Sequence, residues 1–240
     1  MSLCSIIILT YNALEYTRLC YESIQRFTNL PYELVFVDNG STDGTREFLR
    51  RLRSGNRIVI ENPSNVGFAR GCNQGARAAG GDLLLFLNND TVVTKNWLTN
   101  LTACLHSDPR IAAVGPVSNV AAGAEIRTTY KNLTEMQVFA CHYNRLNHKK
   151  WRPVRTASGF CLMVKKAVFD VLNGFDEQFE TGFFEDTDLT LRMTQRGYRV
   201  MVAGDTFVHH FGSMSYKANQ LDIEYWMNVN SAKFNRKHPT

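Results

Sequence analysis

Continuous apolar runs alternate with segments of helical spacing through the first half of the chain. The runs are rich in Val, Ile, Leu and Phe, which is typical of strands buried on both faces of a parallel sheet. These predicted strands are residues 4–12, 32–40, 57–63 and 82–90. The segments between them repeat apolar residues at helical spacing, the third after a glycine-tolerant loop, and predict helices. These predicted helices are residues 14–28, 41–54 and 65–81.

Residues at the ends of two of these helices predict how the helices begin and stop. Ser41 or Thr42 is a plausible N-cap for the second helix, because a hydroxyl can accept from the free N–H groups of the first turn. Gly80 and Gly81 predict a left-handed C-cap for the third helix.

The second half of the chain is less regular. Residues 96–108 predict a helix and residues 111–118 a strand, whereas residues 119–155 have no sustained period and predict mobile loops, one of which could close over a ligand. A regular pattern of apolar residues resumes at residues 158–176. Neither a repeat nor a change in composition marks a linker, so we predict a single domain over residues 1–240.

Repeated strand and helix units predict an α/β fold with a mostly parallel central sheet and helices on both faces. Polar residues stand at the carboxyl ends of three of the predicted strands, at residues 10–12, 38–41 and 88–90. Because the carboxyl ends of parallel strands share one edge, and open sheets bind ligands there, we expect these three clusters to converge.

Composition narrows the class of protein. The 240 residues are 44% hydrophobic and 20% charged, and no run approaches the roughly 18 apolar residues of a membrane span. The chain passes from Met1 directly into a strand pattern without a signal peptide, which predicts a cytoplasmic location. The six cysteines form no CxxC pair and predict reduced core thiols.

The net charge of +5 is modest and does not call for nucleic acid as a partner. Its main concentration is residues 145–155, with a second group at residues 233–238. One interpretation is a solvated loop. The other is a peripheral contact with a membrane surface or an anionic acceptor, because clustered cations beside an aromatic residue attract acidic head groups.

Asp38 stands where the second apolar run stops and polar residues begin. A carboxylate there can accept hydrogen bonds from a base or ribose, while N–H groups of the following turn face phosphate. The alternative is an Asx turn that leads into a helix cap. A dinucleotide-dependent oxidoreductase is disfavoured, because no G-x-G-x-x-G motif follows the first strand.

Six motifs spread over residues 4–215 together resemble the family 2 glycosyltransferases, with the rhamnosyltransferase-like members nearest. They are SIIILTYNALEYTRLCYESI, VFVDNGSTDGT, NVGFARGCNQG, LFLNNDTVV, FEDTDLTLRMTQRGY and VHHFGSMS. The resemblance implies a GT-A type, Rossmann-like mixed sheet and inversion at the anomeric carbon. It also implies a nucleotide-binding half over about residues 1–118 and an acceptor-binding half over about residues 119–240.

The resemblance assigns site residues by matching position. Residues of the nucleotide-sugar pocket would be Thr10, Tyr11, Asn12, Asp38, Asn65, Gly67, Phe68, Asn73, Asn88 and Asn89, with Asp38 bonding the base. Acceptor-binding candidates are Ser158, Gly159 and Gly182. The family's acidic pair matches Glu185 and Asp186, with Asp186 expected as the general base and Glu185 orienting it or touching the acceptor.

The family's metal motif matches Asn88, Asn89 and Asp90, so the resemblance implies Mg²⁺ or Mn²⁺ held by Asp90 against the donor diphosphate. His209 matches a further ligand in some relatives, and His210 is a weaker candidate. Many relatives have two or three acids in this motif where this chain has one, which implies looser metal binding or transfer without metal. An Asp188–Arg192 helix pair is expected nearby.

The predicted function is an inverting glycosyltransferase. It would move a sugar from a UDP or dTDP donor to a saccharide or lipid-linked acceptor, in synthesis of cell-surface polysaccharide. The alternative is a nucleotide-sugar-binding domain without transfer activity, which the single acid of the metal motif favours and the retained acidic pair disfavours.

Overall fold

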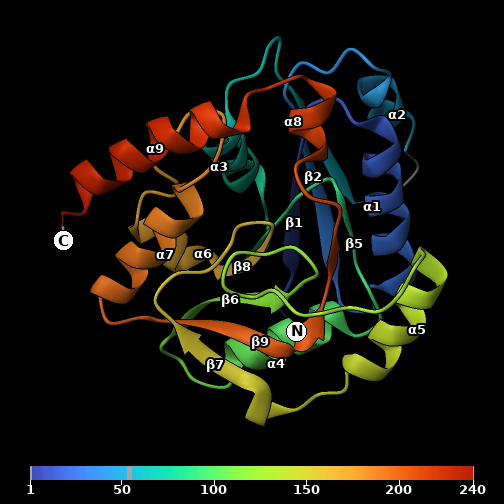
Figure 1. Cartoon of the computed structure of the whole chain (residues 1–240), viewed down its shortest axis with the longest axis vertical. Coiled ribbons are helices and arrows are strands. Elements are labelled where there is room, and N and C mark those ends of the chain that lie inside the picture. Colours follow the sequence, from blue (N-terminus) through green and yellow to red (C-terminus); the bar gives the residue numbers. More distant parts are fainter. Residues whose placement is uncertain (1, 53–55, 240) are drawn as a thin grey trace.

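The computed structural model describes residues 2–52 and 56–239. Within these residues the main sheet has eight strands in the order β3-β2-β1-β4-β8-β6-β9-β7 (Figure 1). The strands are β1 (Cys4–Thr10), β2 (Tyr32–Asp38), β3 (Arg57–Glu61), β4 (Leu83–Leu87), β6 (Ile111–Val117), β7 (Trp151–Val154), β8 (Cys161–Lys165) and β9 (Arg199–Phe207). A small antiparallel ribbon joins β5 (Thr91–Val92) to β10 (His209–His210).

The sheet is parallel in its first half and mixed in its second. β1 pairs in parallel with β2 and β4, and β2 with β3, so these strands end at one edge. β8 runs antiparallel between β4 and β6, while β9 is parallel to β6 and antiparallel to β7. The three polar clusters after β1, β2 and β4 therefore share an edge, as the sequence predicts.

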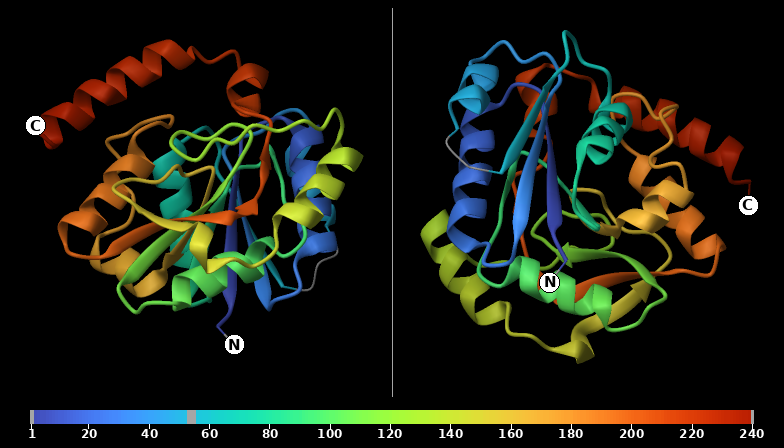
Figure 2. Two further views of the ribbon diagram at one scale, coloured as in Figure 1. Left: turned by 60° about the horizontal axis from the view of Figure 1, so that its bottom comes forward. Right: turned by 180° about the vertical axis from the view of Figure 1, so that it is seen from behind.

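Helices cover both faces of the sheet (Figure 2). One face carries α1 (Leu14–Phe27), α2 (Thr45–Arg51), α4 (Trp97–His106) and α5 (Leu133–Tyr143). The other carries α3 (Phe68–Ala78), α6 (Lys166–Val171) and α7 (Glu185–Gln195). Helix α8 (Met214–Ala218) lies over the carboxyl edge of the first strands, and α9 (Ile223–Lys237) continues from it past α3 toward α7 (Figure 1).

Strand alternation divides the core between these two faces. Ile6 and Ile8 of β1 pack with α1 and α4, whereas Ile7 packs with α3. Successive side chains of a strand point to opposite faces, so a strand that is buried on both sides needs apolar residues throughout. This is why the predicted strands have continuous apolar sequences.

The predicted helix caps differ from the observed ones. Helix α2 begins after Gly44, whose φ of 94° is left-handed, and the Asp43 carboxylate accepts from the N–H and hydroxyl of Thr45. Neither Ser41 nor Thr42 is the N-cap, because the chain first makes the turn that carries the Ser41 N–H to Asp38. Residues 53 and 54 of the predicted helix lie outside the described residues.

The predicted glycine C-cap of α3 is also wrong. Helix α3 ends at Ala78 with an extended Ala79, because the N–H groups of Gly80 and Gly81 bond Glu33 and Ser5 side chains instead of closing the helix.

Residues 119–155 are more ordered than the sequence suggests. They contain α5, the 3-10 turn η1 (His148–Lys150) and β7. Helix α5 buries only Met136 and Ala140, so its apolar periodicity is weak. Five of the six cysteines are buried and Cys141 is exposed; all six are free. In the described part of the chain, none of the helices combines the length and the apolar character of a membrane span.

Candidate functional site

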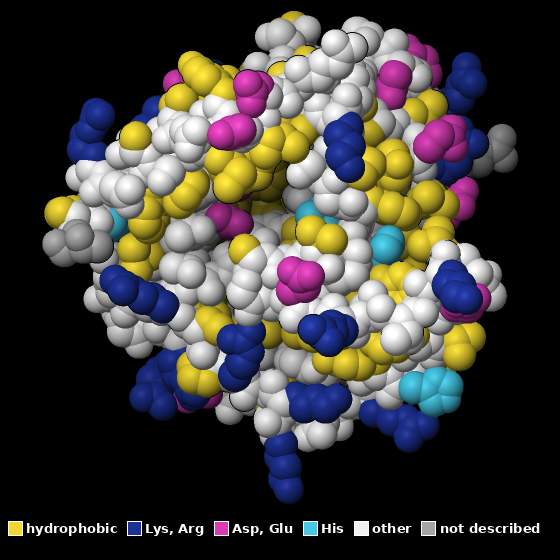
Figure 3. Space-filling view, viewed as in Figure 1, with side chains coloured by type: hydrophobic (Ala, Val, Ile, Leu, Met, Phe, Trp, Pro, Cys, Tyr) yellow, Lys and Arg dark blue, Asp and Glu magenta, His cyan; other side chains and the backbone are white. Residues whose placement is uncertain are grey.

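A cavity of about 610 Å³ opens at the carboxyl edge of β1, β2 and β4. Figure 3 shows it as a hollow in the middle of one face, rimmed by apolar side chains. Of the predicted site residues, it is lined by Tyr11, Asn65, Phe68, Asn88, Asn89, Asp90, Ser158, Gly159, Gly182, Glu185 and Asp186. The wall does not include Thr10, Asn12, Asp38, Gly67, Asn73 or His209.

Asp38 lies beneath the cavity wall and is fully buried. Its carboxylate meets the Arg46 guanidinium at 3.0 Å and accepts from the Thr10 hydroxyl and the Ser41 N–H. Strand alternation explains the placement, because Asp38 shares the parity of Phe36, whose side chain packs on the α1 and α2 face. The neighbouring Asn39 lines the cavity instead, a residue that the sequence analysis missed.

An amide network supports the wall at Asn39. Its side-chain nitrogen donates to the Asn65 oxygen at 3.0 Å and to the Gly67 carbonyl, and its oxygen accepts from Asn62. Gly67 has a φ of 90°, and a Cβ there would lie 3.2 Å from the backbone nitrogen of Thr181. Asn73 instead binds both the N–H and the carbonyl of Phe175, outside this cavity.

Asp90 and His210 form the pair that is best suited to a metal ion. Asp90 Oδ1 lies 3.1 Å from His210 Nε2, and its Oδ2 accepts from the Met214 N–H at 3.0 Å. Burial raises the pKa of Asp90, but the hydrogen bond and charge of His210 and the Met214 N–H together hold it below its ordinary value. Burial lowers the pKa of His210, and contact with Asp90 outweighs it and raises that pKa.

The histidine next to it points elsewhere. His209 Nδ1 lies 2.6 Å from the Tyr130 hydroxyl, and its ring packs against Phe211. Burial, followed by the charge of His210, lowers the pKa of His209 to about 4. Consecutive residues of β10 face opposite sides, so only one of them can meet Asp90. The structure brings His210, and not the expected His209, to the acid.

The donor set at Asp90 fits a divalent cation that a diphosphate would complete. One carboxylate and one imidazole suit Mn²⁺ well, and Mg²⁺ prefers oxygen alone. His210 Nδ1 faces the Val120 carbonyl at 3.0 Å, which orients Nε2 toward Asp90. Among residues 2–52 and 56–239, no three His, Cys, Asp or Glu side chains gather as a complete metal site.

Two carboxyls at the start of α7 occupy the opposite part of the cavity. Asp186 accepts from the Gly159 N–H at 2.5 Å and from the Thr187 N–H at 2.6 Å. Glu185 is 5% exposed, and its Oε2 has no hydrogen-bond partner among the described residues. The glycine permits this approach, because a Cβ at Gly159 would lie 2.9 Å from the Cβ of Asp186.

Burial affects the two carboxyls unequally. It raises the pKa of Glu185 well above the ordinary 4.5, and the charge of Asp186 raises it further. Burial also raises the pKa of Asp186 above its ordinary value, and the N–H groups of Gly159 and Thr187 limit that rise. The pair can therefore hold a proton on Glu185 beside an ionised Asp186.

The C-terminal segment covers this cavity, which the sequence analysis did not foresee. The Ser215 hydroxyl donates to the Asn89 side chain, and Asn219 binds both the Tyr11 carbonyl and the Asn12 side chain. Tyr216, Leu221 and Met227 line the cavity. No local pattern of residues 211–227 indicates these contacts, because their partners are about 125 to 208 positions away.

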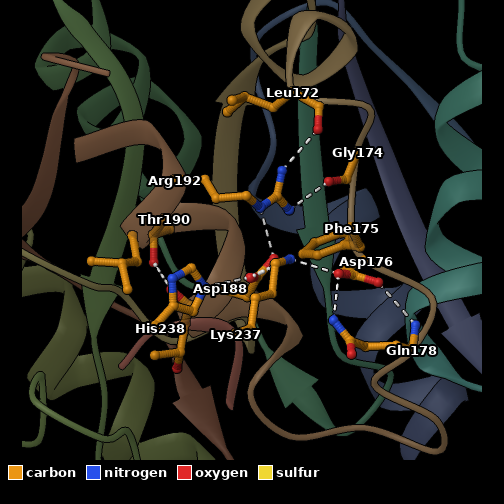
Figure 4. A network of polar contacts seen from close by, with 12 residues as sticks. Leu172, Gly174, Phe175, Asp176, Gln178, Asp188, Thr190, Arg192, Lys237 and His238 are labelled. Atoms are coloured by element: carbon orange, nitrogen blue, oxygen red, sulfur yellow. Dashed lines mark hydrogen bonds and ion pairs between the residues drawn. The ribbon is translucent and has the colours of Figure 1, made fainter. Parts of the chain in front are cut away.

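A buried charge anchors the end of α9 behind the site (Figure 4). Asp188 is fully buried and bonds Arg192 at 2.7 Å, Lys237 at 2.7 Å and His238 at 2.8 Å. The Arg192 pair is the one that the helical spacing predicts. Lys237 also reaches Asp176 at 2.5 Å, so α9 is tied to both α7 and the preceding loop.

Comparisons with known proteins identify the family and the fold. The sequence model of glycosyl transferase family 2 matches residues 5–172. The O-antigen biosynthesis protein RfbC of Myxococcus xanthus is 30% identical over 228 residues, which cover 88% of this chain and 17% of RfbC. The O-antigen chain rhamnosyltransferase WbaN of Salmonella anatum is 26% identical over 218 residues, covering 86% of this chain and 64% of WbaN. The chain thus spans less than two thirds of both relatives.

Two solved structures share the fold. The mannosyltransferase PcManGT from Pyrobaculum calidifontis, in complex with GDP-Man and Mn²⁺, matches with a TM-score of 0.70 at 19% identity, over 97% of this chain and 64% of that one. GalNAc-T7 with UDP, GalNAc and Mn²⁺ matches with a TM-score of 0.70 at 17% identity, over 88% and 44%. The predicted GT-A type sheet is confirmed.

We predict that Asp188→Asn lowers the free energy of unfolding by about 3 kcal/mol, because it removes the buried anion that Arg192, Lys237 and His238 share. Urea denaturation followed by circular dichroism measures the change. The matched control is Asp176→Asn, because the Asp176 side chain is 29% exposed and meets the same Lys237. It should cost about 1 kcal/mol or less. Equal losses in the two variants would contradict the central role of Asp188.

We predict that Glu185→Gln gains stability relative to the wild type as pH rises from about 5 to about 8. The raised pKa lets the folded Glu185 keep a proton that the unfolded chain has released. That stabilisation is complete below about pH 4.5 and is lost as pH rises through the folded pKa, whereas glutamine never ionises.

Denaturation of both proteins across this pH range tests the effect. Glu22→Gln, at an exposed position of α1, serves as the control. A difference between Glu185→Gln and the wild type that stays constant with pH would show that the wild-type carboxyl does not hold its proton.

Proposed function

The chain belongs to glycosyl transferase family 2, and from that premise we propose that it is an inverting glycosyltransferase. It moves a sugar from a UDP or dTDP donor to a saccharide or lipid-linked acceptor in cell-surface polysaccharide synthesis. One observation carries the proposal: a single cavity joins the Asp90–His210 pair to the Glu185–Asp186 pair. The named functions of RfbC and WbaN support the polysaccharide context.

The donor would bind over the ends of β1, β2 and β4. Tyr11, Asn39 and Asn65 line this part of the cavity, and Phe68 adds an aromatic wall. The hydrogen bond between the nucleotide base and Asp38 stays a prediction. In the structure, Asp38 instead contacts residues that hold the turn on which Asn39 lies. We propose that residues 1–118 serve the donor and residues 119–240 the acceptor within one domain.

Asp90 and His210 are the residues that would hold Mn²⁺ or Mg²⁺. A divalent cation bound there supplies Lewis-acid stabilisation of the charge that develops on the departing diphosphate. Asn88 and Asn89 flank the acid and can bind phosphate or water by their amides. His210 is kept in orientation by the Val120 carbonyl and by stacking on Phe160, with ring centroids 5.1 Å apart.

Asp186 is the proposed general base. The acceptor oxygen forms a bond to the anomeric carbon as the bond to the diphosphate oxygen breaks, and the hydroxyl proton passes to the Asp186 carboxylate. Two N–H donors favour the ionised form of this residue, whereas Glu185 has no such donor at Oε2. Glu185, holding its own proton, can donate a hydrogen bond to the acceptor or to its neighbour.

We also propose that residues 145–155 contact a phosphate-bearing surface, either the lipid-linked acceptor or the inner face of a membrane. The sequence has no acidic residue between Glu135 and Asp170, and Arg145 and Lys149 are exposed. Leu146 is 53% exposed beside these cations. Exposed apolar and cationic residues together favour binding at a lipid interface.

Hydrolysis of a panel of UDP, dTDP and GDP sugars, with and without Mn²⁺, tests the donor part of the proposal. Release of nucleotide diphosphate from one donor that depends on metal is the expected result. Metal-dependent binding of a donor with neither hydrolysis nor transfer would favour the nucleotide-sugar-binding alternative.

We predict that Asp186→Asn and Asp90→Asn differ in their effects. Asp186→Asn keeps the side-chain shape but removes the proton acceptor, so transfer should fall by about 10²–10⁴-fold while donor affinity changes by only about two- to threefold. Asp90→Asn should weaken both donor affinity and transfer, because Asp90 would reach the diphosphate through the metal.

Calorimetry with UDP and Mn²⁺ measures affinity, and donor turnover measures the rate. Glu185→Gln is the matched variant of the neighbouring carboxyl. An inactive Glu185→Gln beside a normal Asp186→Asn would move the base by one residue, and activity in both variants and their double would reject the mechanism.

A further inference from the structure

Four consecutive residues directly before Glu185 have left-handed backbone conformations. The φ angles are 62° at Thr181, 140° at Gly182, 71° at Phe183 and 73° at Phe184. Three of the four carry a Cβ, for which this region is unfavourable, and bulky residues adopt it only where the surroundings enforce it. This left-handed run, residues 181–184, therefore stores backbone strain beside the carboxyl pair.

The C-terminal helices hold the left-handed run in place. The Tyr216 hydroxyl of α8 donates to the Thr181 carbonyl at 2.9 Å. Asn230 of α9 is fully buried and donates to the carbonyls of Glu180 and Gly182 at 2.9 and 2.6 Å. Because Asp188 anchors the end of α9 (Figure 4), the enforcing contacts are themselves fixed.

The left-handed run places two aromatic rings on the cavity wall, and each ring packs against a different C-terminal helix. Phe184 packs on Phe234 of α9, with ring centroids 5.4 Å apart, and so contributes to the helix interface. Phe183 contacts Tyr216 at a centroid distance of 5.0 Å, and like Phe184 it is only partly buried. Both line the cavity next to Glu185 and Asp186. A strained backbone that leaves an aromatic ring partly uncovered indicates a surface that a ligand covers.

We propose that Phe183, backed by Tyr216, is the platform on which the acceptor sugar stacks, and that it therefore determines acceptor specificity. The inference rests on the proposed glycosyl transfer. One face of a pyranose ring presents C–H groups and its edges present hydroxyls, so a sugar can cover the ring while directing a hydroxyl toward Asp186. Phe183 stands three residues before the proposed base Asp186, and the left-handed run sets the path of the backbone that leads into α7.

A Phe183→Gly variant separates this role from a packing role. Glycine adopts the left-handed conformation freely, so the substitution relieves strain while it removes the ring. If the ring serves the acceptor, the variant should melt within about 2 °C of the wild type or above it. Its affinity for the acceptor should fall by about tenfold or more, with UDP affinity unchanged. Phe183→Tyr should restore acceptor affinity.

The probes are methyl glycosides of glucose, galactose, mannose, rhamnose and N-acetylglucosamine, added to the protein with UDP and Mn²⁺. Saturation-transfer NMR should show at least one glycoside bound by the wild type through its ring C–H protons, and lost in Phe183→Gly. Asn173→Gly controls for strain relief alone, because Asn173 has a φ of 58° and an exposed side chain outside this cavity. If Phe183→Gly fails to fold, Phe183→Asn replaces it, since asparagine tolerates this conformation.

Several results would overturn the platform. They are binding of no glycoside to the wild type, equal binding by Phe183→Gly, or a large fall in its melting temperature with unchanged acceptor affinity. Calorimetry of the wild type with UDP and with dTDP separates failure of the proposed function from failure of the platform. Absence of binding of both nucleotides would reject the proposed function itself, whereas normal binding of either nucleotide with unaltered glycoside binding by Phe183→Gly would reject only the platform.

Discussion

The antiparallel insertion of β8 between β4 and β6 is the constraint on which the site depends. Leu87, the last residue of β4, pairs with Cys161, the first of β8. The residues after β4 therefore lie beside those before β8, and the Asn88 N–H donates to the Phe160 carbonyl at 2.8 Å. A parallel strand at this position would have carried residues 156–160 to the opposite edge. Through this pairing the Asn88–Asp90 motif and the Gly159 loop share one cavity.

The same loop connects the two polar pairs of the site. Phe160 stacks on His210, which meets Asp90, and the neighbouring Gly159 gives its N–H to Asp186. Two adjacent residues thus position groups that belong to the Asp90–His210 pair and to the Glu185–Asp186 pair. The different hydrogen bonding of Glu185 and Asp186 follows from this contact, because Gly159 reaches only one of the two.

The helices that cover the cavity are held by charged residues that lie outside it. Asp188 binds Arg192 of its own helix and both Lys237 and His238 near the C-terminus. These contacts fix α9, whose Asn230 holds the backbone of residues 180–182. A buried carboxylate needs several hydrogen-bonding partners. If the end of α9 moved away, Asp188 would lose Lys237 and His238, and this loss would destabilise the fold. Backbone strain at the cavity is in this way balanced by a polar network behind α7.

The sequence by itself determined the α/β class, the bounds of β1, β2, β3, β4 and β6 to within a few residues, and the family resemblance, which the family match confirms. These properties are local: apolar periodicity and short motifs do not depend on distant partners. The tertiary structure alone decided that Asn39 rather than Asp38 lines the cavity, that His210 rather than His209 meets Asp90, and that residues 213–227 cover the site. Those outcomes depend on which face of a strand each side chain points to and on contacts between residues more than 100 positions apart. A sequence motif identifies residues but does not determine the direction of their side chains.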